Sequence, residues 1–243
     1  MEKPEQQLIK QIPNAITLTN LFVGCMAIVY VYFDHSLKIS AYLIMLAAVL
    51  DFLDGFIAKR LNAMSEMGKQ LDSFADMISF GVAPGLILFQ MLAIYYQQQE
   101  NAFEFTKAHY FPGFIFTLFA AIRLSKFNIS ENKKHFKGIP TPAAALFVAS
   151  LPLITFYGDL GLGIYILRSS TLYIITAVIS YLMISDMDIL SLKFDDFKWQ
   201  GNEHRIVLCT LAILLGAIFK FESIPMILVL YILISKHYFK NKN

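Results

Sequence analysis

The chain has 243 residues, of which 57% are hydrophobic, 14% aromatic and 16% charged. Soluble domains have about 25% charged and 45–50% apolar residues, so the composition excludes an ordinary water-soluble fold and disfavours disorder. The formal net charge of +2 is too small to indicate a nucleic-acid-binding protein by bulk electrostatics.

Eight apolar segments of roughly the length that a bilayer requires follow one another along the chain. They are residues 12–33, 39–58, 72–96, 111–124, 142–157, 171–184, 206–219 and 223–238. The fourth, sixth and seventh are short, so six or seven spans is the alternative count. The sequence therefore predicts an all-α integral membrane protein, a polytopic helical bundle of about eight transmembrane helices. Cys25 and Cys209 lie within these segments and are expected as small buried hydrophobic residues.

Basic residues are divided unevenly between the two sides of such a bundle. With eight spans, 16 of the 20 basic residues lie on the side that holds both termini. Because basic loops stay in the cytoplasm, both termini are expected there, in the cell membrane, with the active site at the cytoplasmic face. The 16 residues are Lys3, Lys10, Lys59, Arg60, Lys69, Arg123, Lys126, Lys133, Lys134, Lys137, Lys193, Lys198, Arg205, Lys236, Lys240 and Lys242.

Four carboxylates lie where the second and third segments meet, in the stretch DFLDGFIAKRLNAMSEMGKQLDSFAD. Asp51 and Asp54 are three residues apart at the end of the second segment, and Asp72 and Asp76 are four apart at the start of the third. Each spacing puts its pair on one face of a helix. A short loop makes the two helices antiparallel neighbours, so we expect all four carboxylates at the same membrane depth.

Carboxylates at membrane depth cost about 2.5 to 3.5 kcal/mol each on insertion scales, and four together repel one another. A cation must therefore neutralise them. One explanation is ion pairing with Lys59, Arg60 and Lys69. The other is one or two divalent cations, Mg²⁺ or Mn²⁺, which prefer oxygen ligands. Paired metals beside carboxylates recur at sites of displacement at phosphorus, because they clamp the attacking and the leaving oxygen.

Small residues accompany the carboxylates. Gly55 follows Asp54 directly, Ala58 lies about one turn further along the helix, and Gly68 lies four residues before Asp72. Small side chains would let a flat ligand approach the helix backbone. The alternative is close packing between membrane helices.

The pattern D-x-x-D-G-x-x-A-K-x8-G-x3-D-x3-D, built from these aspartates and small residues, resembles the signature of the CDP-alcohol phosphatidyltransferase family. The family usually has Arg after the Ala, where this chain has Lys59 followed by Arg60. A lysine offers a point charge and an arginine a fork, so either Lys59 contacts phosphate through one charge or Arg60 takes that role. Residues 12–20, 73–85 and 121–145 are similar to the phosphatidylserine synthase branch.

This resemblance implies transfer of the phosphatidyl group from CDP-diacylglycerol to the hydroxyl of L-serine, giving phosphatidylserine and CMP by metal-assisted displacement at phosphorus. By matching positions, Asp51, Asp54 and Asp72 would hold Mg²⁺ or Mn²⁺, expected as two ions. Asp76 would be the general base and also a ligand. The resemblance further implies a homodimer. The sequence contains no internal repeat or low-complexity tract, so we expect a single membrane domain over residues 1–243. The resemblance implies a catalytic core at 1–145, with additional transmembrane helices at 146–243.

Polar residues recur every three positions in the first segment, at Asn14, Thr17 and Asn20, with Pro13 as a first-turn residue. On one helix face they would line the nucleotide cavity, and hydrogen bonding between helices is the alternative. The expected nucleotide and substrate contacts are Asn14, Thr17, Gly55, Ala58, Lys59, Arg60 and Gly68.

Three basic residues, Arg123, Lys126 and Lys137, are candidates for holding the lipid phosphate or the serine carboxylate. The alternative is a topogenic cluster that attracts anionic lipids without specificity. Gly81 and Pro84 are expected to bend the third span just beyond the aspartates.

Two other functions remain open. The same chemistry could use glycerol 3-phosphate or an inositol phosphate, although a phosphorylated acceptor calls for a denser basic pocket. A divalent-cation transporter would also place carboxylates in a helical bundle, but near the bilayer midplane and along a pathway rather than at one helix end.

Overall fold

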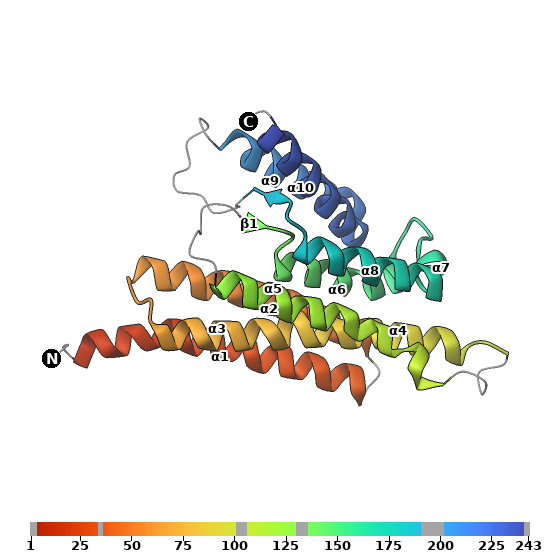
Figure 1. Ribbon diagram of the computed structural model, residues 1–243, viewed down its shortest axis with the longest axis horizontal. Helices are drawn as coiled ribbons and strands as arrows, with labels where there is room; N and C mark the ends of the chain where they lie inside the picture. The colour runs from red at the N-terminus through yellow and green to blue at the C-terminus, as the bar shows by residue number, and fades with distance from the viewer. Residues whose placement is uncertain (1–3, 34–35, 101–105, 130–135, 191–201, 241–243) are drawn as a thin grey trace.

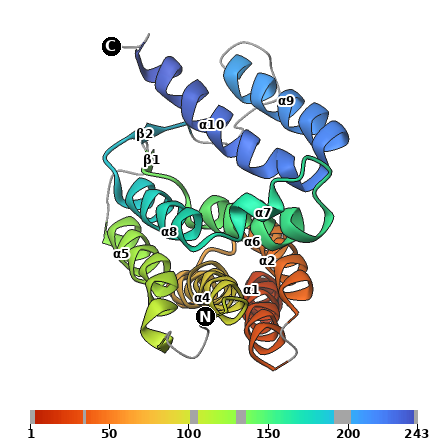
Figure 2. The same cartoon turned by 90° about the vertical axis from the view of Figure 1, so that its right-hand side faces the viewer.

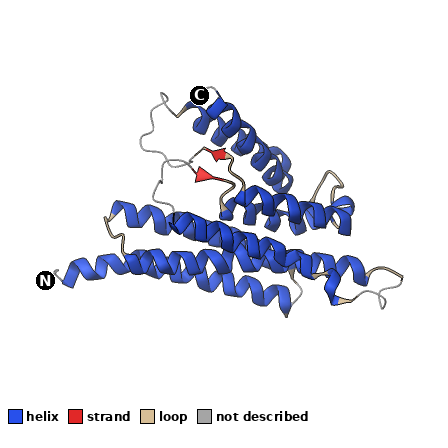
Figure 3. Cartoon of the chain, in the orientation of Figure 1, coloured by secondary structure: helices blue, strands red, loops and turns tan. Residues whose placement is uncertain are grey.

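Figure 1 presents the computed structural model of the chain, which describes residues 4–33, 36–100, 106–129, 136–190 and 202–240. These residues form helices apart from one short two-stranded ribbon (Figure 3). The first half contains α1 (Pro4–Tyr32), α2 (Leu37–Arg60), α3 (Glu66–Asp76), the π-helix η1 (Met77–Val82), α4 (Ala83–Gln97), the 3-10 turns η3 (Lys107–His109) and η4 (Phe111–Phe114), and α5 (Ile115–Ile129). The second half contains β1 (Phe136–Lys137), α6 (Thr141–Tyr157), α7 (Gly163–Ile166), α8 (Ser169–Ile184), β2 (Asp188–Ile189), α9 (Glu203–Phe219), η5 (Lys220–Glu222) and α10 (Ser223–Lys240).

Each of the eight predicted segments is helical, so the prediction of an all-α fold is confirmed. Four helical ranges are long and apolar enough to cross a membrane: Gln11–Tyr32, Leu37–Arg60, Glu66–Gln97 and Glu203–Lys240. The last range contains α9 and α10, which η5 joins and which pack against each other. The count of eight spans and the cytoplasmic placement of the termini stay predictions.

The helices are arranged in layers (Figures 1 and 2). α1, α2, the long α3–η1–α4 helix and α5 form one layer, α6 and α8 lie on it, and the α9–α10 hairpin lies on the far side of α6 and α8. Apolar side chains of α4 and α6, such as Leu88, Met91 and Leu153, are completely buried between them. α6 therefore joins the two halves of the molecule.

Many large apolar side chains point away from this core. Phe22, Phe52 and Ile213 are 65%, 70% and 73% exposed, which is unfavourable in water and favourable in lipid. Cys25 and Cys209 lie on the same outward faces and are exposed. Their predicted burial in the core is therefore wrong, because an apolar membrane helix is apolar on its lipid side as well as on its inner side.

Two features of the first helix differ from the prediction. α1 begins at Pro4, well before the apolar segment, so the polar residues at its start extend the helix beyond the apolar part. Pro13 consequently lies inside α1 and is not a first-turn residue. The Thr17 side chain lies beside it, with Oγ1 3.0 Å from the Pro13 carbonyl oxygen.

The third predicted span continues as a helix past Gly81 and Pro84, and the bend expected there stays a prediction. The helix continues from α3 into α4 through the π-helical segment η1, which follows Asp76 directly. Proline at position 84 has no N–H to donate within the helix. The nearby Gly81 carbonyl accepts a hydrogen bond of 2.9 Å from Thr117 Oγ1 of α5. Such π segments often accompany functional sites, because they redirect side chains on a helix face.

Some of the basic residues behind the topology prediction lie outside the described residues. These are Lys3, Lys133, Lys134, Lys193, Lys198 and Lys242. The four basic residues expected on the other side of the membrane, Lys38, Lys107, Arg168 and Lys220, are all described. Lys38 lies over the rings of Phe156 and Tyr157, and Lys220 Nζ lies 2.9 Å from Asp159.

Gly24 controls how closely α1 approaches η1. A Cβ atom at this position would lie 3.0 Å from Ser79 Cα, and the Ser79 hydroxyl donates a hydrogen bond of 3.1 Å to the Asn20 carbonyl. Close backbone approach through small residues is the usual way in which membrane helices associate.

We predict that Gly24→Ala lowers the free energy of unfolding by about 1–3 kcal/mol, because the methyl group overpacks a backbone contact. Thermal unfolding in detergent measures the change. Gly216→Ala on α9 is the matched control, since a Cβ there meets no atom within 4 Å. Equal stability of the two variants would contradict the prediction.

Candidate functional site

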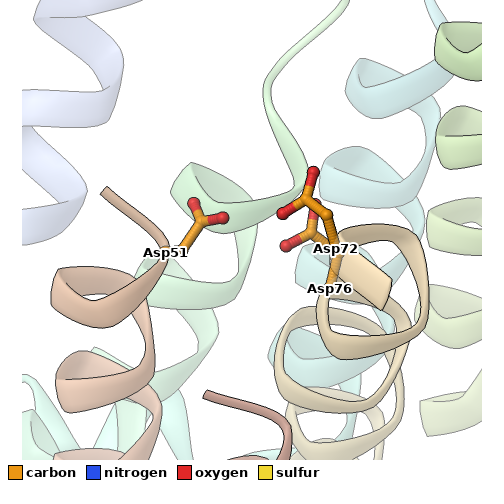
Figure 4. A group of neighbouring side chains, drawn as sticks. All are labelled: Asp51, Asp72 and Asp76. Carbon is orange, nitrogen blue, oxygen red and sulfur yellow. The ribbon is translucent and has the colours of Figure 1, made fainter. Parts of the chain in front are cut away.

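Three of the four predicted carboxylates come together between two helices. Asp51 projects from α2, and Asp72 and Asp76 project from α3 into the same space (Figure 4). One oxygen atom from each carboxylate lies within 4.8 Å of the other two, and all three residues are half-buried. This spacing allows a single cation to contact all three side chains.

The turn between α2 and α3 makes this meeting possible. α2 ends at Arg60, and Asn62 adopts a positive φ of 49°, a conformation that asparagine tolerates better than most residues. Ser65 then caps α3, its hydroxyl oxygen accepting a hydrogen bond of 3.0 Å from the Gly68 N–H. The reversal is short, so the end of α2 lies beside the start of α3.

Asp54 lies outside the group of three. It is 5% exposed, and Oδ2 accepts a hydrogen bond of 2.7 Å from Thr17 Oγ1 of α1. Asp54 is nevertheless close enough to Asp72 and Asp76 for their charges to interact. Its role as a metal ligand stays a prediction.

α1 reaches the site through its predicted polar face. Asn14 lies against α3, where a Cβ on Gly68 would be 2.8 Å from Asn14 Oδ1. Asn20 is completely buried, and neither amide atom of its side chain has a hydrogen-bond partner among the described residues. Gly68 therefore lies in close contact with α1, and its predicted part in substrate binding stays a prediction.

A buried basic residue, Arg123, lies near the carboxylates. Arg123 of α5 is 8% exposed, donates a hydrogen bond of 3.1 Å to Thr141 Oγ1 and interacts electrostatically with Asp76. Thr141 is the first residue of α6 and completely buried. Thr141 was not among the predicted site residues, although the Thr-Pro pair at the start of the fifth apolar segment was a usable signal.

The other two basic candidates lie further out. Lys126 is exposed near the end of α5. Lys137 is exposed on β1, with Nζ 3.5 Å from the Asp186 carboxylate. Of the three, Arg123 is the one whose charge interacts with Asp76.

The remaining motif residues lie along the last turns of α2. Gly55 is exposed, and a Cβ there would meet no atom within 4 Å. Ala58 is half-buried, while Lys59 and Arg60 are exposed. Gly55 follows Asp51 by four residues, so it lies on the same helix face and leaves open space beside that carboxylate.

The three grouped aspartates fit a hard divalent cation. Carboxylate oxygens are the ligands that Mg²⁺ and Mn²⁺ prefer. Asp76 Oδ1 is buried and has no hydrogen-bond partner among the described residues, an arrangement that is costly without a positive charge next to it. The exposed Lys59, Arg60 and Lys69 offset this charge less well than a cation in the group, because solvent screens them.

Comparison of the sequence with known protein families identifies one that contains these residues. The family model described as CDP-alcohol phosphatidyltransferase matches residues 10–183. The chain belongs to the CDP-alcohol phosphatidyltransferase family. The match includes the four aspartates, Thr17 of α1 and Arg123 of α5, and it ends before β2, α9 and α10.

This chain is also similar in sequence to several named proteins, of which three are described here. A CDP-diacylglycerol–serine O-phosphatidyltransferase of Helicobacter pylori is 36% identical over 145 residues, which cover 58% of this chain and 57% of that protein. A protein of the same name from Bacillus subtilis is 32% identical over 203 residues, covering 79% of this chain and 94% of its own length. An archaetidylserine synthase of Methanothermobacter thermautotrophicus is 31% identical over 166 residues, covering 67% and 66%.

The shared length differs between these relatives. The chain spans little more than half of the Helicobacter pylori protein and nearly all of the Bacillus subtilis protein. The catalytic core predicted at 1–145 and the additional helices at 146–243 stay predictions.

We predict that Thr17→Val weakens Mn²⁺ binding to the purified protein by about tenfold or more, because residues that orient metal ligands typically contribute that much. Thr17→Ser keeps the hydroxyl and should bind Mn²⁺ normally. Isothermal titration measures the affinity independently of activity.

The control for this prediction is Thr19→Val, since the Thr19 hydroxyl donates to the Ala15 carbonyl of its own helix at 2.8 Å and lies on the exposed side. Unchanged Mn²⁺ affinity in Thr17→Val would separate Asp54 from the metal site. Tighter binding would mean that Thr17 holds Asp54 away from the other carboxylates.

Proposed function

We propose that this chain is a membrane enzyme that transfers the phosphatidyl group of CDP-diacylglycerol to the hydroxyl of L-serine, releasing CMP and forming phosphatidylserine. The observation that carries the proposal is the group formed by Asp51, Asp72 and Asp76, within the segment that matches the family model. A group of carboxylates of this kind suits displacement at phosphorus.

The names of the relatives support serine as the acceptor. Two of the three reported above are named for serine O-phosphatidyl transfer, and the third is named an archaetidylserine synthase. The seryl product is common to these names, while the lipid differs. Sequence similarity therefore supports the acceptor more strongly than it supports any particular lipid chain.

Asp76 is the proposed general base. Its Oδ1 atom lacks a hydrogen-bond partner among the described residues, so it is available to accept a proton. The serine hydroxyl oxygen forms the new bond to phosphorus, the bond from phosphorus to the CMP oxygen breaks, and the hydroxyl proton passes to Asp76 Oδ1. The α2–α3 turn fixes the position of this carboxylate relative to Asp51.

The proposed cofactor is Mg²⁺ or Mn²⁺, as two ions, held by Asp51, Asp72 and Asp76 together with Asp54. When bound, divalent ions neutralise the pyrophosphate and stabilise the charge of the leaving CMP. Thr17 orients Asp54 within this set through its hydrogen bond.

The nucleotide is proposed to approach α2 at Gly55, where a side chain would otherwise occupy the open space beside Asp51. Lys59 and Arg60, one turn further along, would contact its phosphates. On the other side of the carboxylates, Arg123 would bind the serine carboxylate or the lipid phosphate through guanidinium N–H groups other than the one bonded to Thr141.

The setting proposed for this reaction is the cytoplasmic face of the cell membrane, with eight spans and both termini in the cytoplasm. The uneven distribution of basic residues supports this topology. The enzyme is proposed to act as a homodimer and as a single membrane domain. The position of the aspartates at adjoining helix ends favours catalysis over cation transport through the bilayer centre.

The central test is CMP release by purified protein given CDP-diacylglycerol and L-serine, glycerol 3-phosphate or an inositol phosphate. We expect release that requires serine and Mg²⁺ or Mn²⁺, and its loss after EDTA treatment. Asp76→Asn should lower the rate at least about 100-fold, the usual contribution of a general base, while CDP-diacylglycerol still binds.

Full activity after EDTA treatment would contradict the metal assignment. An unchanged rate in Asp76→Asn would contradict the assignment of the base. Release with a different alcohol would change the proposed acceptor, and release with none of the alcohols would contradict the proposed function.

We also predict that Gly55→Leu abolishes CDP-diacylglycerol binding while the fold remains at least as stable. Leucine favours the helix by up to about 1 kcal/mol relative to glycine, and its side chain fills the open space beside Asp51. Nucleotide affinity and thermal unfolding are measured on the same preparation. Gly216→Leu on α9 is the matched control, and normal binding by Gly55→Leu would refute the proposed approach route.

A further inference from the structure

Helix α10 lies outside the segment that matches the family model, yet its Tyr231 interacts with Arg123 of the proposed site. α10 carries Tyr231 and Ser235, which are one turn apart and both buried. Tyr231 donates a hydrogen bond of 2.8 Å to the Leu190 carbonyl, and the Leu190 N–H donates one of 3.1 Å to Ser235 Oγ. The two side chains thus hold both polar groups of one backbone position.

Leu190 directly follows the β2 strand, so this pair of hydrogen bonds fixes the ribbon. β2 pairs antiparallel with β1, with Ile189 opposite Phe136 and Asp188 opposite Lys137. Two further hydrogen bonds extend the connection, from the Gly138 N–H to Met187 and from the Ile139 N–H to Leu182. Figure 2 shows the ribbon between α8 and α10.

The ribbon leads directly to the acceptor side of the proposed site. Four residues after the end of β1, α6 begins at Thr141, whose hydroxyl accepts the hydrogen bond from Arg123. Arg123 also lies close enough to the Tyr231 hydroxyl for an electrostatic interaction. A connected set of contacts therefore runs from α10 through the ribbon and Thr141 to the guanidinium beside Asp76.

An arginine needs such support to act on a substrate. Its side chain has several rotatable bonds, and each bond that is free in the unbound protein reduces the affinity for an anion that must find one conformation. Thr141 accepts a hydrogen bond from one N–H of the guanidinium, and the burial of the Arg123 side chain restricts its other conformations.

We propose that Tyr231 and Ser235 are positioning residues for the acceptor, which hold Leu190 and thereby set Thr141 and Arg123 beside Asp76. The proposal rests on the proposed function, because it concerns the binding of the serine carboxylate. It assigns to α10 a part in acceptor binding that is separate from the metal site.

Tyr231→Phe tests the proposal, since it removes one hydroxyl and keeps the buried ring. We expect the KM for serine to rise about fivefold, the effect of losing one intramolecular hydrogen bond. The KM for CDP-diacylglycerol and the Mn²⁺ affinity should change less than about twofold, because Arg123 is assigned here to the serine carboxylate and not to the lipid phosphate. A rise in the KM for CDP-diacylglycerol with an unchanged KM for serine would refute this assignment. Ser235→Ala, measured in the same way, should also raise the KM for serine.

The matched control is Tyr173→Phe on α8. Tyr173 likewise donates a hydrogen bond of 2.8 Å to a backbone carbonyl, that of His109. Its hydroxyl lies 3.0 Å from that of Tyr96, near the end of the α3–η1–α4 helix that is opposite to the aspartates. We expect this variant to leave the KM for serine unchanged.

The outcomes separate this inference from the proposed function. If the wild-type protein releases CMP with serine and Tyr231→Phe and Ser235→Ala keep the normal serine KM, the positioning role is refuted. A parallel loss of both substrate affinities and of thermal stability in both variants would also refute it, in favour of a purely structural role. If the wild-type protein uses another alcohol, the proposed acceptor is wrong, and the same KM comparison with that alcohol decides the role of Tyr231.

Discussion

The first three helices must compensate for the repulsion between carboxylates whose oxygen atoms lie within 4.8 Å of one another in an apolar bundle. In a medium of low dielectric constant such charges destabilise the fold unless a cation or a hydrogen bond offsets them. Thr17 supplies a hydrogen bond to Asp54, and Arg123 supplies a positive charge near Asp76. The close packing at Gly24 and Gly68 holds α1 where these contacts are possible.

The π-helical segment after Asp76 shows how the backbone serves the same constraint. A helix that carries two carboxylates at its start must still pack its apolar remainder against α1, α5 and α6. The η1 segment changes the helical register between these two tasks, and side chains from other helices support it. The Ser79 hydroxyl bonds to α1, and the Thr117 hydroxyl of α5 bonds to the Gly81 carbonyl. The position of Asp72 and Asp76 along their helix therefore depends on how η1 packs against α1 and α5.

Much of the helical fold and the grouping of the aspartates could be predicted from the sequence. Apolar length identified a helix in each of the eight predicted segments but not the short helix α7, and the spacing of the aspartates identified two helix faces that had to meet. Contacts between distant residues could not be predicted, because periodicity reports a face and not its partner. The bond from Thr17 to Asp54 and the partner of Arg123 belong to this class. The exposure of Cys25 was missed because lipid and core select the same apolar residues.

The short turn between α2 and α3 also bears on how the protein folds. Asp51 and Asp76 are joined by a compact hairpin, so their meeting requires the closure of a short loop, which costs little chain entropy. The contact of Leu190 with Tyr231 must close a longer stretch, and the pairing of β1 with β2 a longer one still. Contacts of low sequence separation form first when a chain folds from its N-terminus. The proposed metal-binding half of the site can therefore assemble during synthesis, while the proposed acceptor half is completed only once α10 has emerged.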